Sequence, residues 1–200
     1  MPTDTAAISR ALLRIAQAAR RQVRSDNLGL TPAQSQTVLF CGRTRPDFAS
    51  IGHLSQALGA THATAVGIVD GLVRRGLIER RAKLDDRRVT LLTLTNSGQQ
   101  VFAALTESSN ILDQAIERLE PAQRDALLDA VRSLGRMLAH EGAIQVSEPC
   151  AGCTHFFPHE QPSQDRPHFC RSLRQHLNAI EILLECPRFT PETTSVSSRS

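Results

Sequence analysis

Residues 61–98 read THATAVGIVDGLVRRGLIERRAKLDDRRVTLLTLTNSG, and this stretch decides the fold. Thr61 suits the N-cap of a helix, and Gly76 suits the position just after the end of that helix. Two short strand-like runs follow and are separated by a charged, polar stretch, which predicts a β-hairpin. The expected elements are a helix over 61–75, strands at 77–81 and 89–94, and a helix that starts after Thr95.

Apolar side chains at helical spacing predict further helices on both sides of this stretch. Residues 5–26 form one amphipathic pattern, and Thr31-Pro32 begins a second helix with a capping residue and a first-turn proline. A short helix over about 49–58 precedes Gly59, and two helices joined by such a turn make a helix-turn-helix. The fold class is therefore mainly α with a small β-hairpin wing. Two long helices complete it, at about 96–118 and 121–141.

Composition and charge place the chain among globular proteins with a focused basic surface. Of the 200 residues, 40% are apolar and 22% are charged. No apolar run reaches the ~20 residues that span a bilayer, and the first 25 residues lack a signal peptide, so we expect a cytoplasmic protein without a membrane partner. Between Asp70 and Arg88, seven basic residues accompany four acidic ones. Such a concentration is typical of a nucleic-acid footprint, although a solvated face is the alternative.

The order of elements and three short motifs resemble the MarR family of transcription regulators. The motifs are Asp86-Arg87-Arg88 in the wing, Leu94-Thr95 followed by Gly98, and the run Leu72–Arg80. The resemblance covers about residues 5–141. It implies a homodimer, with dimerisation helices from both ends of the core. It also implies a pseudo-palindromic double-stranded DNA operator, from which a small-molecule effector would release the protein. We expect a repressor, and the C-terminal cysteines add a redox effector as the alternative.

Residues with three different roles at the DNA follow from this arrangement. The first turn of a recognition helix presents side chains to base edges in the major groove, whereas arginines at its far end contact phosphates. By resemblance, Arg88 enters the adjacent minor groove, and Asp86 supports the wing without touching DNA. The expected DNA-binding residues are Thr61, His62, Thr64, Ala65, Arg74, Arg75, Arg87 and Arg88.

Four cysteines near the C-terminus predict a metal site outside the family core. Cys150 and Cys153 are separated by two residues, and Cys170 and Cys186 follow. Four thiolates suit tetrahedral zinc or an iron–sulfur cluster. The Cys186-Pro187 pair and the neighbouring phenylalanines favour an iron–sulfur cluster over Zn²⁺. Unliganded cysteines, a redox dithiol pair or a histidine ligand in place of one thiolate are the alternatives.

The cysteine pattern sets the expected domain boundaries and a hypothesis for sensing. We expect a DNA-binding and dimerisation domain over 1–146, a Cys/His-rich metal-binding appendix over 147–189 and a disordered tail over 190–200. Because only a short linker separates the appendix from the last long helix, oxidation or loss of the metal would move it against the dimerisation helices. This movement would change the spacing of the two recognition helices.

Two other classes of protein compete with a DNA-binding regulator. A cysteine-based redox enzyme is one, but the sequence has no dinucleotide fingerprint, P-loop or Ser/His/Asp constellation. The Cys150/Cys153 pair also lacks the βαβ context of thioredoxins. The second is a winged-helix protein-interaction module with structural zinc, against which the basic wing argues. We therefore expect no enzyme.

Overall fold

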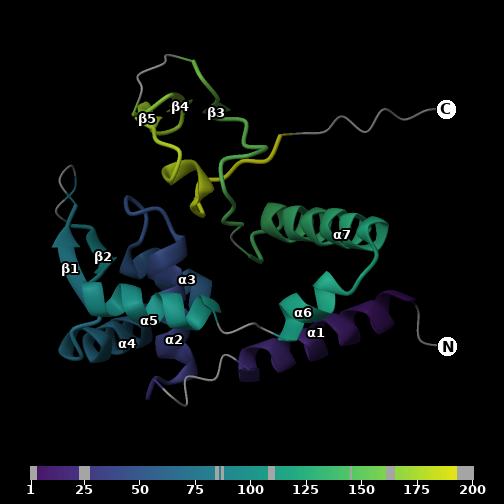
Figure 1. Cartoon of the computed structure of the whole chain (residues 1–200), viewed down its shortest axis with the longest axis horizontal. Coiled ribbons are helices and arrows are strands. Elements are labelled where there is room, and N and C mark those ends of the chain that lie inside the picture. The colour runs from purple at the N-terminus through teal and green to yellow at the C-terminus, as the bar shows by residue number, and fades with distance from the viewer. Residues whose placement is uncertain are drawn as a thin grey trace.

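The computed structural model describes residues 4–22, 28–83, 86, 88–107, 111–144, 146–160 and 165–192. Figure 1 shows α2 to α5 with β1 and β2 on one side, and α1, α6 and α7 on the other. The cysteine segment, which contains β3 to β5 and the four C-terminal cysteines, lies over both groups. None of the described helices is long and apolar enough to cross a bilayer. The elements are α1 Asp4–Gln22, α2 Pro32–Arg43, α3 Ile51–Leu58, α4 His62–Arg74, β1 Ile78–Ala82, β2 Thr90–Leu94, α5 Asn96–Glu107, α6 Ile111–Glu117, α7 Pro121–His140, β3 Phe156–Phe157, β4 His168–Cys170, β5 Gln175–Leu177 and a 3₁₀ turn Glu181–Leu183.

The helix-turn-helix begins each of its helices with a side-chain cap. Thr31 and Gln34 form a reciprocal capping box at α2, and the Ser50 hydroxyl accepts from the backbone N–H of His53 at α3. Gly59 ends α3 in the left-handed conformation, which glycine adopts without steric cost. The core beneath these helices consists of Leu30, Val38, Leu54, Ala65, Val69, Leu72, Leu77, Ile78 and Leu92.

The wing is a two-stranded antiparallel sheet that is joined to the α2–α3 loop. β1 pairs with β2, so that Ile78 lies opposite Leu94. The backbone N–H of Leu92 donates to the carbonyl of Ala49 at 2.6 Å, and Ser50 forms a bridge with Leu91. The α2–α3 loop therefore pairs with β2 as a short third segment of the wing sheet. As a result, the loop, the start of α3 and the wing are fixed relative to one another.

The Leu94-Thr95…Gly98 motif locks the wing onto the start of α5. The Thr95 hydroxyl accepts from the backbone N–H of Gly98 at 3.0 Å and donates to the carbonyl of Gly76 at 2.6 Å. A Cβ atom at position 98 would lie 2.0 Å from the carbonyl oxygen of Leu77. Only glycine allows this approach of α5 to the first residues of the wing.

The second group of helices exposes much apolar surface. α7 has no buried residue along its whole length, and α1 and α6 pack mainly on each other. An isolated amphipathic helix of this kind is marginally stable in water, because its apolar stripe has nothing to pack against. The exposed large apolar residues of α1 and α7 are Ile8, Leu12, Leu13, Ile15, Leu127, Leu128, Val131, Leu134 and Met137.

Two expected boundaries differ from the structure. The helix expected over 96–118 is two helices, α5 and α6. Between them the sequence has Ser-Ser-Asn at 108–110, residue types that favour caps and turns and that lie outside the described residues. The tail expected from residue 190 is also wrong at its start. Thr154 N–H donates to the carbonyl of Thr190, and Glu192 N–H donates to the carbonyl of Gly152, so residues 190–192 are part of the hydrogen-bonded segment. Residues 193–200 lie outside the described residues.

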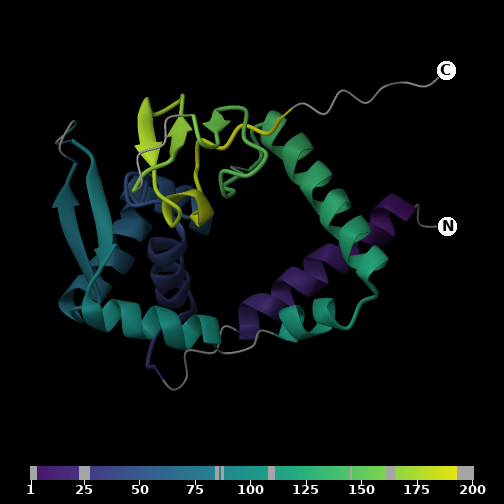
Figure 2. The same cartoon turned by 45° about the horizontal axis from the view of Figure 1, so that its top comes forward.

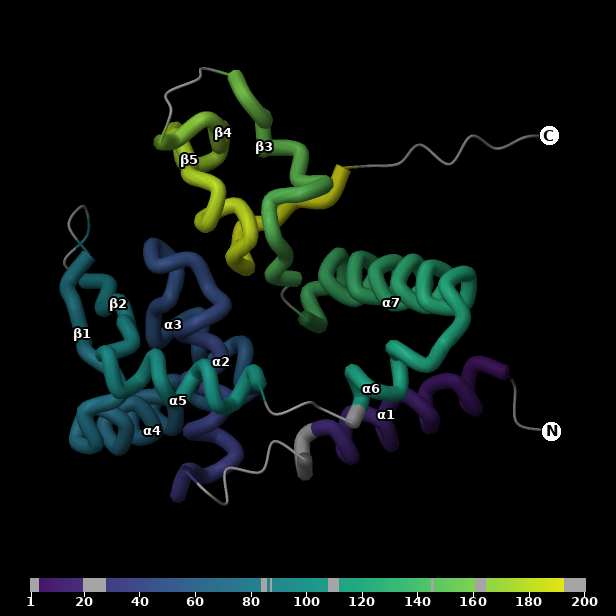
Figure 3. The backbone as a smooth tube through the Cα atoms, viewed as in Figure 1, coloured from purple at the N-terminus to yellow at the C-terminus, as the bar shows by residue number. Residues whose placement is uncertain are grey.

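The cysteine segment has its own small sheet and is docked on the α2–α3 loop. Its strands are ordered β3-β4-β5, all antiparallel, with Cys170 opposite both Phe156 and Gln175. A parallel bridge joins it to the reading domain, which consists of α2 to α5 with β1 and β2. In this bridge Glu185 N–H donates to the Arg43 carbonyl at 2.9 Å, and Arg45 N–H donates to the Glu185 carbonyl at 3.0 Å. Figures 2 and 3 show the segment next to the α2–α3 loop at one end and α7 at the other.

Candidate nucleic-acid interface and cysteine pocket

The first turn of α4 is exposed and held by its cap. The Thr61 hydroxyl accepts from the backbone N–H of Thr64 at 3.2 Å, and the two hydroxyls lie 2.8 Å apart. Thr61, His62 and Thr64 are all exposed. Gly67 lies one turn further along, and a Cβ atom there would meet nothing within 4 Å. This face of α4 is therefore open enough for another macromolecule to approach its backbone closely.

Ala65 does not belong to this face, and its predicted contact with DNA is wrong. Its side chain is 0% exposed and packs in the core with Val69 and Leu72. Positions 65, 69 and 72 follow the i, i+4, i+7 spacing of a buried helical stripe, so the signal was present in the sequence. Ala63 is exposed in its place.

The two arginines at the end of α4 differ in their surroundings. Arg74 is exposed in the last turn. The Arg75 guanidinium donates to the carbonyl of Gly29 at 2.6 Å and to the carbonyl of Leu28 at 3.0 Å. The expected phosphate contact of Arg75 stays a prediction. Its guanidinium braces α4 against the chain that leads into α2, a long-range contact that sequence reasoning cannot see.

The wing presents Arg88 next to a tight turn. The Asp86 carboxylate accepts from the backbone N–H of Arg88 at 3.1 Å, and the Asp86 carbonyl accepts from Val89 N–H. Arg88 itself is exposed. Arg80 on β1 forms an ion pair with Asp70 on α4 at 2.8 Å, which ties the wing to α4. Arg87, also expected to bind DNA, lies outside the described residues.

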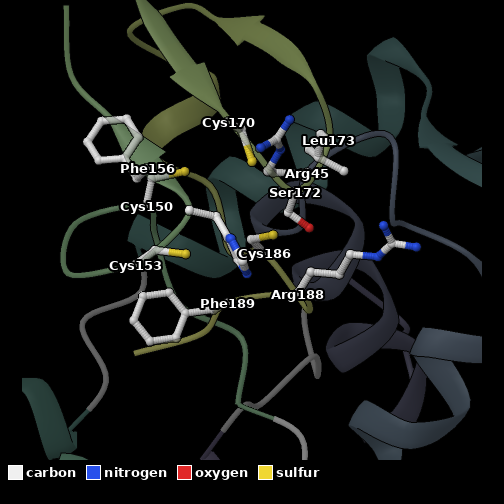
Figure 4. Close-up of a pocket in the computed structure, with 11 residues that line it drawn as sticks. Arg45, Cys150, Cys153, Phe156, Cys170, Ser172, Leu173, Cys186, Arg188 and Phe189 are labelled. Carbon is white, nitrogen blue, oxygen red and sulfur yellow. The ribbon is translucent and has the colours of Figure 1, made fainter. Parts of the chain in front are cut away.

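The structure brings the four C-terminal cysteines to one pocket. All four side chains are buried thiols, and none forms a disulfide. Figure 4 shows their sulfurs facing the same space, with Phe156, Phe189 and Leu173 beside them. Gly152 takes φ of +76° between the first two cysteines, and Cys153 N–H donates to the Cys150 carbonyl, so this pair forms a tight turn. Four soft sulfur donors behind an apolar wall suit a thiolate-bound metal centre.

The pocket is not yet arranged as a complete ligand set. No group of three or more His, Cys, Asp or Glu side chains in the described ranges could hold a metal ion as it stands. Burial raises the pKa of the Cys150 thiol to about 11 and also raises the pKa of Cys186, while the nearby Arg45 charge acts to lower both. The Cys150 and Cys186 thiols are therefore protonated at neutral pH, and a metal ion would have to displace these protons and draw the four sulfurs together.

Arg45 is the residue of this pocket that the sequence analysis missed. It lies on the α2–α3 loop, is only 1% exposed and lines the pocket with the four cysteines. Its Nη2 lies 3.5 Å from the Asp47 carboxylate, and that side chain is 48% exposed. Its Nε and Nη1 have no hydrogen-bond partner among the described residues. An arginine in a loop reads as solvated from sequence, and no local signal marks it as buried.

Comparison with known proteins identifies relatives of the reading domain. The MarR family model matches residues 28–88. The transcriptional repressor MprA of Escherichia coli (strain K12) is 38% identical over 82 residues, which cover 40% of this chain and 47% of MprA. The uncharacterised HTH-type transcriptional regulator YfiV of Bacillus subtilis is 26% identical over 89 residues, 44% of this chain and 56% of YfiV. The chain thus spans about half the length of the curated relatives it matches.

A solved structure shares the fold over a longer part of the chain. The transcriptional repressor CouR, bound to a 23-mer DNA duplex, superposes with a TM-score of 0.51 at 27% identity. The alignment covers 66% of this chain and 92% of CouR. All three are named as transcription regulators or repressors, which agrees with the expectation that the chain is no enzyme. The described chain is mostly helical with one β-hairpin wing and has the winged helix-turn-helix fold, and its residues 28–88 match the MarR family model.

Proposed function

We propose that this protein is a transcription regulator, a repressor, that binds double-stranded DNA with α4 in the major groove and the wing in the minor groove. The observation that carries the proposal is the joint exposure of the α4 first turn and of Arg88. The Arg80–Asp70 ion pair and the close packing at Gly98 fix α4 and the wing relative to each other. His62 and Thr64 would read base edges, and Arg74 would contact a phosphate.

The same proposal includes a homodimer. α7 has no buried residue, and Val131 is 48% exposed within a stripe that includes Leu127 and Leu134. A second copy that packs α1 and α7 against its own would remove this apolar stripe from water. Two-fold symmetry then presents two α4 helices to successive major grooves, which matches a pseudo-palindromic operator.

Arg88 supplies the direct test of the DNA-binding proposal. The operator is first selected from random double-stranded DNA, and its affinity is then measured by fluorescence anisotropy across a series of salt concentrations. Arg88→Ala is expected to weaken operator binding by roughly tenfold or more and to reduce the salt slope by about one, because one minor-groove cation is lost. Arg124→Ala removes the same charge from the exposed start of α7 and is the matched control. Equal affinity of the two variants would contradict the wing assignment.

We further propose that Cys150, Cys153, Cys170 and Cys186 hold a metal centre that tunes DNA binding. Support comes from the convergence of four buried thiols on one apolar-walled pocket. Four thiolates would complete tetrahedral zinc or anchor an iron–sulfur cluster, which would add redox chemistry. The segment reaches the reading domain through the backbone bridge at Glu185, and it borders α7 across a groove lined by Val131, Ile144 and Pro191. It thus adjoins both the reading domain and the expected dimer helix.

Metal removal tests this part of the proposal. Protein purified without oxygen is expected to contain one metal centre per chain, measured by elemental analysis and absorbance. Stripping it is expected to change operator affinity by about fivefold or more, the scale of a coupling free energy of about 1 kcal/mol. The Cys150→Ser/Cys153→Ser variant should lose the metal and the response together, whereas Cys41→Ser, outside the pocket, should keep both. Wild-type protein with less than a tenth of an equivalent of metal would refute the metal site.

A further inference from the structure

The strongest feature outside the DNA-binding surface is the buried cation at the edge of the cysteine pocket. Arg45 comes from the winged-helix domain, yet its side chain lines a pocket that the cysteine segment otherwise builds. A guanidinium stays protonated at any physiological pH, so it cannot avoid the cost of burial by losing its charge. A buried, uncompensated ion costs several kcal/mol. The fold therefore needs an anion at this place.

No described protein group supplies that anion adequately. Asp47 is the ion-pair partner, but the N–O distance is 3.5 Å, the carboxylate is half exposed, and it also accepts from the Gln175 amide at 3.0 Å. Phe48 offers only the face of its ring, with its centroid 6.0 Å from the guanidinium carbon. The positive charge of Arg45 and its Nε and Nη1 donors thus remain uncompensated among the described residues.

Binding of a metal by the four cysteines reverses this imbalance. Four thiolates carry four negative charges, and Zn²⁺ returns two positive charges, so the centre has a net charge of about −2. A cubane cluster with two positive charges leaves the same net charge. Either centre places excess negative charge, on polarisable sulfurs that accept hydrogen bonds, beside a buried cation that lacks exactly that partner.

From this geometry we infer that Arg45 is the built-in counter-charge of a four-thiolate metal centre, so that the winged-helix domain completes the site. The inference rests on the metal site proposed above. Arg45 is well placed to relay the state of the centre. Its N–H donates to the Glu185 carbonyl, and its own carbonyl accepts from Phe48 N–H and Ala49 N–H, immediately before the cap of α3. The charge of the centre is therefore balanced by the loop that positions the helix-turn-helix.

The test exploits an opposite effect of one substitution on the two forms of the protein. Arg45→Met removes the charge but keeps a side chain of similar length. In the metal-free protein it is expected to raise the thermal midpoint, because an uncompensated buried ion is lost. In the metal-loaded protein it is expected to weaken Zn²⁺ binding tenfold or more in competition with a chromophoric chelator, as loss of a partner around a metal centre does. Arg45→Lys keeps the charge and should retain most of the Zn²⁺ affinity.

Arg188→Met is the matched control from the same pocket. Arg188 also lines the pocket, but Figure 4 shows its guanidinium pointing away from the sulfurs, and it lies 5.5 Å from the Phe48 ring centroid. Its replacement should leave Zn²⁺ affinity within twofold of wild type. If Arg45→Met lowers the midpoint of both forms and leaves Zn²⁺ affinity unchanged, Arg45 is only structural and the inference is wrong. If the wild-type protein binds no Zn²⁺ at all, the metal site fails first.

Discussion

Gly98→Ala is expected to lower the free energy of unfolding by roughly 3 kcal/mol or more, because its new methyl group has no room. The Cβ atom would stand 2.0 Å from the backbone carbonyl oxygen of Leu77 and 3.3 Å from the Leu94 side chain. A backbone carbonyl at the start of the wing cannot rotate away as a side chain can. The whole start of α5 must therefore shift, which also strains the Thr95 bonds to Gly76 and Gly98.

Urea unfolding followed by circular dichroism measures this loss. Gly67→Ala is the matched control in the same domain, because a Cβ atom there meets nothing within 4 Å and the residue lies inside α4. The control is expected to gain about 0.5–1 kcal/mol from the better helix propensity of alanine. Similar unfolding midpoints for the two variants would show that α5 and the wing do not approach as closely as described.

Val131→Asp is expected to separate the proposed dimer and to weaken operator binding by about a hundredfold or more. A carboxylate in the centre of the apolar stripe of α7 would be buried without a partner in the dimer, at a cost of several kcal/mol. Two half-sites held by one dimer also gain affinity from their linkage, and separate subunits lose that gain. Sedimentation gives the oligomeric state, and anisotropy with the selected operator gives the affinity.

Ser133→Asp introduces the same charge on the polar side of the same helix. Its side chain already contacts Arg136, from which the Ser133 hydroxyl accepts a hydrogen bond at 3.0 Å, so a carboxylate there has a cation beside it. This control should remain dimeric and keep its operator affinity. A Val131→Asp protein that sediments as a dimer would place the subunit interface elsewhere.

The caps and turns of the reading domain were accessible from sequence because each depends on local chemistry. Thr31, Ser50 and Thr61 each cap a helix by accepting from the backbone N–H three residues further along, and Gly59 ends α3 by its own conformational freedom. The buried stripe of α4 was misplaced at Ala65. A small apolar residue suits both the core and a DNA contact, and the i, i+4, i+7 spacing with Val69 and Leu72 is the signal that marks it as buried.

The cysteine pocket depends partly on a local sequence pattern and partly on contacts between residues far apart in the chain. The two-residue spacing of Cys150 and Cys153 predicts, from sequence alone, that both thiols bind one metal ion. The structure places Cys170 and Cys186 in the same pocket. The role of Arg45 depends on a bridge between strands of chain from two domains, formed by Glu185 with Arg43 and Arg45. No local pattern encodes such a contact. The arginine that closes the pocket therefore becomes visible only in three dimensions.

The docking of the cysteine segment on the α2–α3 loop also sets the order in which the protein matures. The loop belongs to a domain whose core is complete by α5, whereas the contacts that cover it, such as Gln175 with Asp47, join residues 128 positions apart. Contacts this distant close late, and domains fold in the order of synthesis from the N-terminus. We therefore expect the reading domain to fold first, with Arg45 open to water until the docking of the cysteine segment withdraws it from solvent.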